Sequence, residues 1–284
     1  MSYIFEPGFF SNAPVRTALV MGALVAIVSA VVGVVTIIRS QSFAGHALTD
    51  VATAGGSGAT LVNINPLIGF ITGAVIGSIA MEAGGMKRAR QRDITTGIVL
   101  GFATGLSALF LYLDATKSAN SGVTQQVLFG SIFTVSSSLL PIAGFISLAV
   151  IGAVAIVWRM LVVTSVNEEI AISKGAPTRL VGTVYMVALA AAVGLSSILI
   201  GSILSTALLI GPAATALRGS KSLVRAVFGA AGIGIAATWS GILLSYDSYY
   251  WEPSNQGLPV SFFIVVLIVL SYAVAAMWHR SPRK

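Results

Sequence analysis

The run 17-TALVMGALVAIVSAVVGVVTII-38 decides the fold class of this chain. It holds no charged residue, and as a helix it is long enough to cross the ~30 Å hydrocarbon core of a bilayer. A cleaved signal peptide has a shorter apolar region, so we expect this segment to stay in the protein as a transmembrane helix.

The rest of the chain repeats this apolar character. Of its 284 residues, 56% are hydrophobic and 9% are charged, and the mean hydropathy is +0.94, so it lacks the polar surface of a soluble domain. Lipid admits only helices or closed barrels, and these apolar runs are too long for barrel strands. We therefore predict an all-α polytopic membrane helix bundle, one transmembrane domain over residues 1–284, with about nine spans at 17–38, 42–62, 67–85, 94–113, 139–158, 179–197, 198–217, 226–245 and 260–278.

The basic residues predict the orientation of the bundle. The net charge is +7, and the Lys and Arg residues cluster in short connections between apolar runs, as the positive-inside rule expects of cytoplasmic loops. With nine spans, only Arg16 and Lys117 fall on the other side of the membrane. We therefore expect the N-terminus outside and the C-terminus in the cytoplasm, and we read the basic charge as topology, not as a sign of a nucleic-acid partner.

A histidine and a carboxylate lie close together in the second predicted span. His46 and Asp50 are four residues apart, so on a helix they share one face and a divalent cation could bridge them. An ionisable residue in a membrane segment costs about 2.5–3.5 kcal/mol and usually faces a cavity or a partner. The chain has no cysteine, so any metal would need nitrogen and oxygen donors, of which Asn63, Asn65, Thr49 and Ser57 are nearby in sequence. The alternative is that Asp50 marks a helix end near water.

Two further segments have a structural and a functional interpretation each. In the connection 160–178, Asn167 can cap a short helix with Glu168 and Glu169 in its first turn, and Gly175 ends it. This helix is either a solvated connector or a docking element for a cytoplasmic partner. Pro212 lies in a late span, where it could introduce a kink that fits helices together or one that serves gating.

Several ordered motifs resemble a known family, the membrane subunits of ATP-binding-cassette importers for zinc, manganese and iron. The strongest is Ala207–Ala216, ALLIGPAATA, and it is similar to the family's Leu-Leu-Ile-x-Pro-Ala-Ala-Thr-Ala signature. Asn65–Gly69, Thr95–Val99 and Leu128–Ile132 match other family segments in the same order along the chain.

The resemblance implies a mechanism and a set of partners. The chain would be a homodimeric permease that passes a divalent metal, its substrate, from an extracytoplasmic metal-binding protein into the cytoplasm by alternating access. It has no Gly-x-x-x-x-Gly-Lys-Ser/Thr loop, so ATP would be hydrolysed by a separate ATP-binding subunit, and we expect neither an enzyme nor a permanently bound cofactor. The location implied is the prokaryotic cell (inner or plasma) membrane.

The resemblance also implies roles for individual residues. The segment at 167–177 resembles the coupling helix that docks on the ATPase, with Glu168, Glu169, Ala171 and Gly175 as contact candidates. The family's second helix typically reads Gly-Asp-Ala-Ile-Ser-His-Ala, so His46 and Asp50 occupy its two metal-path positions with the residue types exchanged.

Two different classes of function stay open beside the importer. One is an ATP-independent secondary metal or cation transporter, or a channel, that uses Asp50 as a relay. The other is a membrane scaffold that transports nothing. The residues do not separate zinc, manganese and iron, because one imidazole and one carboxylate suit each of these metals.

Overall fold

Nine long helices build the part of the protein that the structure describes. The computed structural model describes residues 8–83, 89–117, 127–130, 132–173, 175–251 and 257–280, and we found no strand in these ranges. The long helices are α1 (Ala13–Ile38), α2 (Ser42–Leu61), α3 (Pro66–Ala83), α4 (Ala89–Lys117), α6 (Leu140–Val166), α8 (Thr178–Ile200), α9 (Ser202–Gly219), α10 (Leu223–Ser248) and α11 (Val260–Arg280). A 3₁₀ turn, η1 (Ser137–Leu139), precedes α6, and the short α7 (Glu168–Ser173) follows it.

The helices confirm the all-α, multi-pass membrane class. Each predicted span largely matches one long helix, although the span 198–217 begins within α8 and several helices extend a turn or more beyond the predicted ends. Within the described ranges, six helices are long and apolar enough to cross a bilayer: α1, α4, α6, α8, α10 and α11. Helix α3 is apolar but shorter. Helices α2 and α9 are not among the helices that are both long and apolar enough. In α2, glycine, serine and threonine are frequent and lower the hydropathy. The count of nine spans and the orientation of the termini stay predictions.

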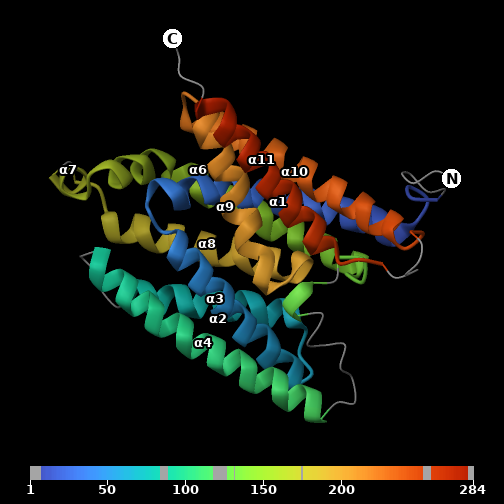
Figure 1. The fold of residues 1–284 in the computed structure, drawn as a ribbon. Coiled ribbons are helices and arrows are strands. Elements are labelled where there is room, and N and C mark those ends of the chain that lie inside the picture. Colours follow the sequence, from blue (N-terminus) through green and yellow to red (C-terminus); the bar gives the residue numbers. More distant parts are fainter. Residues whose placement is uncertain are drawn as a thin grey trace.

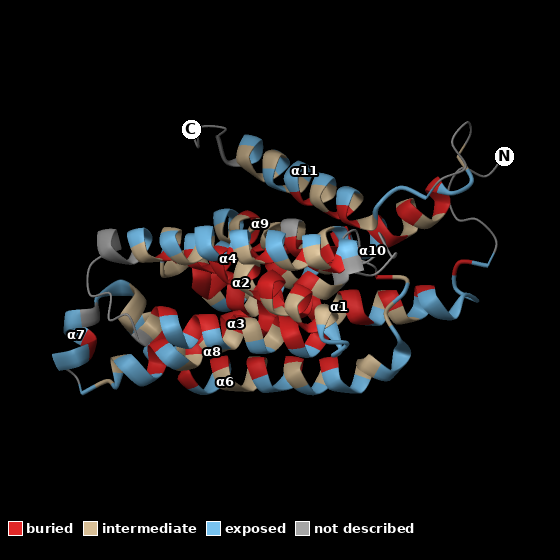
Figure 2. Cartoon of the chain, turned by 90° about the horizontal axis from the view of Figure 1, so that it is seen from below, coloured by how far each residue is buried: buried red, intermediate tan, exposed pale blue. Residues whose placement is uncertain are grey.

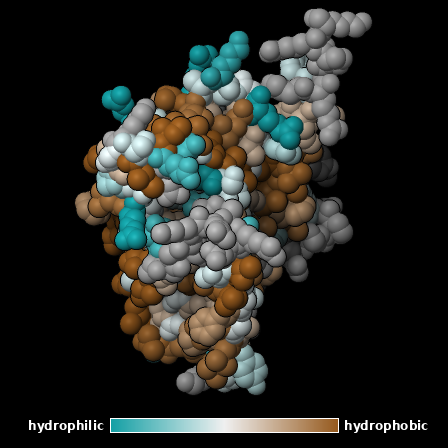
Figure 3. Space-filling view, turned by 90° about the vertical axis from the view of Figure 1, so that its left-hand side faces the viewer, coloured by the Kyte–Doolittle hydropathy of each residue, from teal (hydrophilic) through white to brown (hydrophobic). Residues whose placement is uncertain are grey.

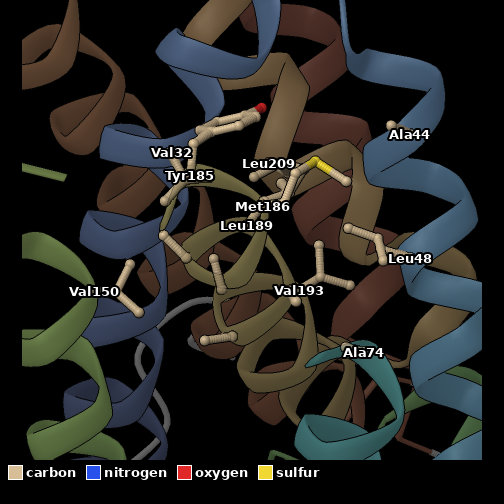
Figure 4. Close-up of a cluster of buried hydrophobic side chains, with 14 of the residues drawn as sticks. Val32, Ala44, Leu48, Ala74, Val150, Tyr185, Met186, Leu189, Val193 and Leu209 are labelled. Atoms are coloured by element: carbon tan, nitrogen blue, oxygen red, sulfur yellow. The ribbon is translucent and has the colours of Figure 1, made fainter. Parts of the chain in front are cut away.

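Helix α8 lies at the centre of the bundle. Buried side chains are concentrated on α1, α2 and α8, while α4, α6 and α11 present exposed faces (Figure 2). Tyr185, Leu189 and Val193 of α8 meet apolar side chains from five other helices (Figure 4). The neighbours drawn there come from α1, α2, α3, α6 and α9: Val32, Ala44, Leu48, Ala74, Val150 and Leu209.

Helices α2 and α3 touch through their backbones. A Cβ added to Gly55 would lie 2.2 Å from the carbonyl oxygen of Gly69, and one added to Gly69 would lie 2.3 Å from the carbonyl oxygen of Gly55. Gly73 is similarly close, since its added Cβ would lie 2.9 Å from the Cα of Gly55. Small residues allow this approach in membrane bundles. The contact fixes α2, which carries His46 and Asp50, against α3.

The connection between α8 and α9 is a sharp break at Gly201. Its φ of 82° and ψ of 158° belong to a region open almost only to glycine. An added Cβ would lie 2.2 Å from the carbonyl oxygen of Leu128, so the segment 127–130 packs directly on this junction.

Hydrophilic side chains occur at one end of the bundle. Helix α7 projects from this end, as do the α1–α2 and α9–α10 connections (Figure 1). The end-on view shows hydrophilic side chains among apolar ones there (Figure 3). This is the end that the charge pattern predicts to be cytoplasmic.

Candidate functional site

His46 reaches from α2 toward α9. Its Nδ1 lies 3.2 Å from Oγ1 of Thr206, and its side chain is exposed in the isolated chain. Thr206 sits in the second turn of α9, one residue after the buried Ser205. The imidazole is thus held by a hydroxyl of another helix while part of it stays accessible.

Asp50 is held by a different helix, α4. Its Oδ2 accepts a hydrogen bond of 2.6 Å from Oγ1 of Thr104, and Ser107 Oγ donates to its backbone carbonyl at 3.3 Å. The Thr104 hydroxyl also lies 2.8 Å from the carbonyl of Leu100, so its single hydrogen has two acceptors within reach. Asp50 is half-buried. The two predicted metal-path residues therefore share α2 but bond to neighbours on different helices.

A chain of hydroxyl groups leads from His46 into the core. Thr206 Oγ1 lies 3.4 Å from Thr49 Oγ1, Ser205 Oγ donates to Thr49 Oγ1 at 3.3 Å, and Ser197 Oγ donates to Ser205 Oγ at 3.5 Å. Thr49, Ser205 and Ser197 are buried. The chain joins α2, α8 and α9, and its contacts are longer than the usual 2.5–3.0 Å of O–H···O bonds.

The hydroxyl groups of α2 also bond to their own helix. Thr49 donates to the carbonyl of Gly45 at 3.1 Å, Thr53 to that of Thr49 at 2.8 Å, and Ser57 to that of Thr53 at 2.7 Å. Each of these hydroxyl hydrogens is used by a carbonyl one turn back, so the oxygens keep lone pairs for other partners.

The donor set suits a transient metal site better than a structural one. Among the described residues, no group of three or more His, Cys, Asp or Glu side chains lies close enough to hold a metal. His46 and Asp50 supply one nitrogen and one carboxylate donor, while Asn65 Oδ1 accepts from the amide of Leu67 and Asn63 takes a left-handed turn, so both have local roles. A structural zinc site is closed by four protein ligands, and two leave open positions for water or a third group.

The predicted coupling segment folds as the sequence indicates. Asn167 Oδ1 accepts the amide of Ile170 at 3.0 Å and caps α7, and Gly175, with a φ of 75°, ends it. Glu169 and Gly175 are exposed, whereas Ala171 is fully buried and anchors α7. The side chain of Glu168 is outside the part that the structure describes. Among the candidates that the structure describes, Glu169 and Gly175 are thus the accessible ones.

Arg39 connects this region to the start of α2. Its Nη1 donates to Thr164 Oγ1 near the end of α6 at 2.9 Å, and its guanidinium carbon lies 5.1 Å from the ring centre of Tyr185. Tyr185 in turn donates to Thr36 Oγ1 of α1 at 2.9 Å. The connection between α1 and α2 is therefore hydrogen-bonded to α6, the helix that precedes α7.

Pro212 is buried inside α9, six residues after Thr206. Next to it, α1 and α9 meet backbone to backbone, because a Cβ added to Gly33 would lie 2.0 Å from the carbonyl oxygen of Leu209. Close helix packing is thus evident at this point, and a role of Pro212 in gating stays a prediction.

Five hydroxyl residues of the site were not predicted: Thr104, Ser107, Ser197, Ser205 and Thr206. The sequence contains an indication of two of them, because Ser205 and Thr206 interrupt an otherwise apolar run in α9. Serine and threonine often bond across helices within membranes. Their pairing with α2 required the fold, since Thr206 is 160 residues from His46.

Comparisons with known proteins show which family and which fold the chain is similar to. The sequence pattern of the ABC 3 transport family matches residues 12–278. The chain is 27% identical to the manganese transport system membrane protein MntC of Listeria innocua, over 86% of this chain and 85% of that protein. It is 25% identical to the high-affinity zinc uptake system membrane protein ZnuB of Haemophilus influenzae, over 81% and 88%. Its fold is similar to PsaBC from Streptococcus pneumoniae in complex with Fab, with a TM-score of 0.78, 23% identity and coverage of 94% and 92%.

Proposed function

Because the chain belongs to the ABC 3 transport family, we propose that it is the permease subunit of an ATP-driven importer for a divalent metal ion. The observation that carries the proposal is the polar face of α2, where His46 and Asp50 offer an imidazole and a carboxylate inside an apolar bundle. Ionisable groups at such positions commonly mark ion pathways.

The metal binds transiently on its way through the bundle. Imidazole and carboxylate donors suit both Zn²⁺ and Mn²⁺, and relatives of this chain are named for manganese and for zinc transport. Among the described residues the site has only two strong donors, so it binds weakly enough to release its substrate, as conduction requires. We propose a first-row divalent metal, with manganese or zinc as the leading candidates.

Energy comes from a separate ATP-binding subunit that docks at α7. Glu169 and Gly175 are accessible on this projecting helix, and the Arg39 contacts link it to the corner before α2. Movement of α7 is thereby passed to the helix that carries His46 and Asp50, which gives alternating access. An extracytoplasmic metal-binding protein delivers the metal at the opposite end, and the whole assembly lies in the prokaryotic cell membrane.

A second copy of the chain completes the pathway. His46 and Thr104 are exposed and Asp50 is half-buried in the single chain. Leaving a carboxylate against lipid costs about 2.5–3.5 kcal/mol, so a protein partner on this face stabilises the membrane-inserted state. A homodimer meets this need with the same surface on both copies.

The alternative of an ATP-independent transporter or channel rests on the same carboxylate. Among the side chains described, the carboxylate of Asp50 bonds to Thr104 alone, so it could exchange this partner for a cation or a proton. The two proposals differ in their need for ATP.

The deciding experiment measures metal uptake into proteoliposomes that contain the chain together with its ATP-binding subunit and its metal-binding protein. Manganese, zinc and iron are compared for the native chain, for Asp50→Asn and for the control Asp93→Asn, an exposed carboxylate near the start of α4. We expect ATP-dependent uptake that Asp50→Asn abolishes and Asp93→Asn retains. Uptake without ATP would support the alternative, and normal uptake by Asp50→Asn would remove Asp50 from the pathway.

Docking at α7 is tested separately by co-purification with the ATP-binding subunit. Glu169→Lys should reduce the amount of bound ATPase subunit, because it reverses a charge on the accessible face of α7. Asp93→Lys reverses a charge elsewhere on the exposed surface and should retain binding. Equal retention by both variants would contradict docking through Glu169.

A further inference from the structure

We propose that Asp114 of α4 is a second cation-binding residue, where the divalent metal binds at the outer end of the bundle before it reaches Asp50. The proposal rests on the proposed function for the direction of transport, whereas binding of a cation at Asp114 stands on its own. Two observations carry it: a buried carboxylate oxygen that has no hydrogen bond to the described residues, and the place of this carboxylate beside the end of α2.

Asp114 is a buried carboxylate that the site around His46 and Asp50 does not use. Its exposed fraction is 3%, and its Oδ2 has no hydrogen-bond partner among the described residues. Buried polar groups are normally bonded, and buried charges are normally paired or coordinate a metal. The side chain of Lys117, one turn further along α4, is outside the part that the structure describes. The carboxylate therefore needs a positive partner that the described residues do not supply.

Asp114 lies on the face of α4 that packs against α2. Of the described helices, α2 is the main neighbour of α4. Among the described residues of α4, the buried ones follow one another at intervals of three, four or seven positions, as on one helix face. They are Thr96, Ala103, Ser107, Leu111 and Asp114.

The contacts between α2 and α4 place Asp114 beside the last turn of α2. Ser107 Oγ donates to the carbonyl of Asp50 at 3.3 Å. Further along both helices, a Cβ added to Gly58 would lie 3.1 Å from the ring of Phe110. The two helices therefore run in the same direction, and Asp114, one turn beyond Phe110, is level with the last turn of α2. This end of both helices lies away from α7 (Figure 1).

The end of α2 adds to the negative character of this place. The last four carbonyl groups of a helix have no partner within it, and together they carry about half of a negative elementary charge. The last turn of α2, which is described in full, holds no basic residue that would balance this charge. Carboxylate and carbonyl oxygens suit Mn²⁺, and a carboxylate also suits Zn²⁺. A divalent cation beside Asp114 is therefore attracted by the carboxylate and by the helix end together.

Asp114 and Asp50 are separate binding positions on the same helix pair. Asp114 is ten residues after Thr104, the partner of Asp50, which corresponds to about 15 Å along a helix. One ion cannot bind both carboxylates at this distance. Asp114 also directly follows the apolar span predicted at 94–113, so it lies where the bundle meets water. A cation that enters from outside therefore meets Asp114 first, and two weak sites in series let it leave each one.

Iron-directed cleavage of the backbone locates bound cations in the intact chain. Fe²⁺, ascorbate and hydrogen peroxide are added to the chain and its ATP-binding subunit in lipid nanodiscs, so that bound iron cuts the backbone nearby, and mass spectrometry identifies the fragments. We expect cuts in α4 close to Asp114 and separate cuts in α2 close to Asp50. Asp114→Asn should lose the first set and keep the second. The control Asp93→Asn changes an exposed carboxylate of the same helix and should keep both sets.

Absence of cuts near Asp114 in the unchanged chain would overturn the proposal, and so would cuts that Asp114→Asn keeps. Unfolding without metal is an independent check. Asp114→Leu should be as stable as the unchanged chain or more stable, because leucine removes a buried acceptor that has no partner among the described residues. A lower unfolding temperature of Asp114→Leu would show that the carboxylate has a protein partner, such as Lys117, and would contradict the proposal.

Uptake into proteoliposomes separates this proposal from the proposed function. Asp114→Asn should lower ATP-dependent metal uptake, whereas Asp93→Asn should not. Normal uptake by Asp114→Asn would overturn the place of Asp114 on the pathway. If Asp50→Asn transports normally while Asp114→Asn loses both its cuts and its uptake, the pathway through Asp50 fails and the site at Asp114 stands.

Discussion

The glycine contact between α2 and α3 predicts that Gly55→Ala is harmful although it replaces a hydrogen with a methyl group. The new Cβ would lie 2.2 Å from the carbonyl oxygen of Gly69 and 2.9 Å from the Cα of Gly73. Both neighbours are backbone atoms, so no side chain can rotate to make room. Ordinary van der Waals contact begins at 3.4 Å, and α2 and α3 must therefore separate by roughly 1.2 Å.

Two opposing terms determine the size of the effect. Overpacking of this kind costs typically about 1–3 kcal/mol. Replacing glycine by alanine within a helix gains up to about 1 kcal/mol from helix propensity. We expect a net loss of about 1–2 kcal/mol in the free energy of unfolding. Because α2 carries His46 and Asp50, their bonds to Thr206 and Thr104 are disturbed too, and metal uptake should fall more than stability suggests.

Thermal unfolding in nanodiscs, measured beside proteoliposome uptake, checks both parts. Gly101→Ala in α4 is the matched control, because a Cβ added there meets nothing within 4 Å. This variant should be as stable as the unchanged chain or more stable, with native uptake. If Gly55→Ala matched Gly101→Ala in both measurements, α2 and α3 would not be in backbone contact in the membrane and the reasoning would be refuted.

Two further changes test other contacts of the bundle. Gly201→Ala should lower the unfolding temperature strongly, because the positive φ is strained for alanine and the new Cβ would overlap the carbonyl of Leu128. The control Gly152→Ala should not lower it, because a Cβ added there meets no atom within 4 Å. Equal unfolding temperatures of the two variants would contradict the break between α8 and α9. Tyr185→Phe removes the 2.9 Å bond to Thr36 from a buried position and should cost about 0.5–1.5 kcal/mol in chemical unfolding, and a cost near zero would show that this hydroxyl pair contributes nothing.

The long helices could be predicted from the sequence because the apolar runs themselves determine them. In lipid each backbone group must bond within its own segment, so a run of about 20 apolar residues has no alternative to a helix. The predicted ends were less accurate where polar residues continue a helix beyond the apolar core. Helix α4, for example, extends from Ala89 to Lys117, although its predicted span was 94–113.

The site could be predicted only in part. His46 and Asp50 were found because their spacing of four residues is local to one helix. Their partners depend on which helices lie beside α2, and Thr104 and Thr206 are 54 and 160 residues away in sequence. The buried position of Ala171 likewise depends on how α7 folds back, which six residues of helix do not reveal.

The backbone contact of α2 with α3 bears on which parts of the bundle can slide. Packed helices slide past each other by small rotations of interlocking side chains, and glycine surfaces in direct contact have none to rotate. Helices α2 and α3 therefore travel together as one rigid body. On the other side, α2 meets α9 through hydroxyl and imidazole contacts of 3.2–3.4 Å, which are weak and easily exchanged for water. If His46 and Asp50 line the proposed metal pathway, its opening is expected along this seam, where His46 would leave Thr206.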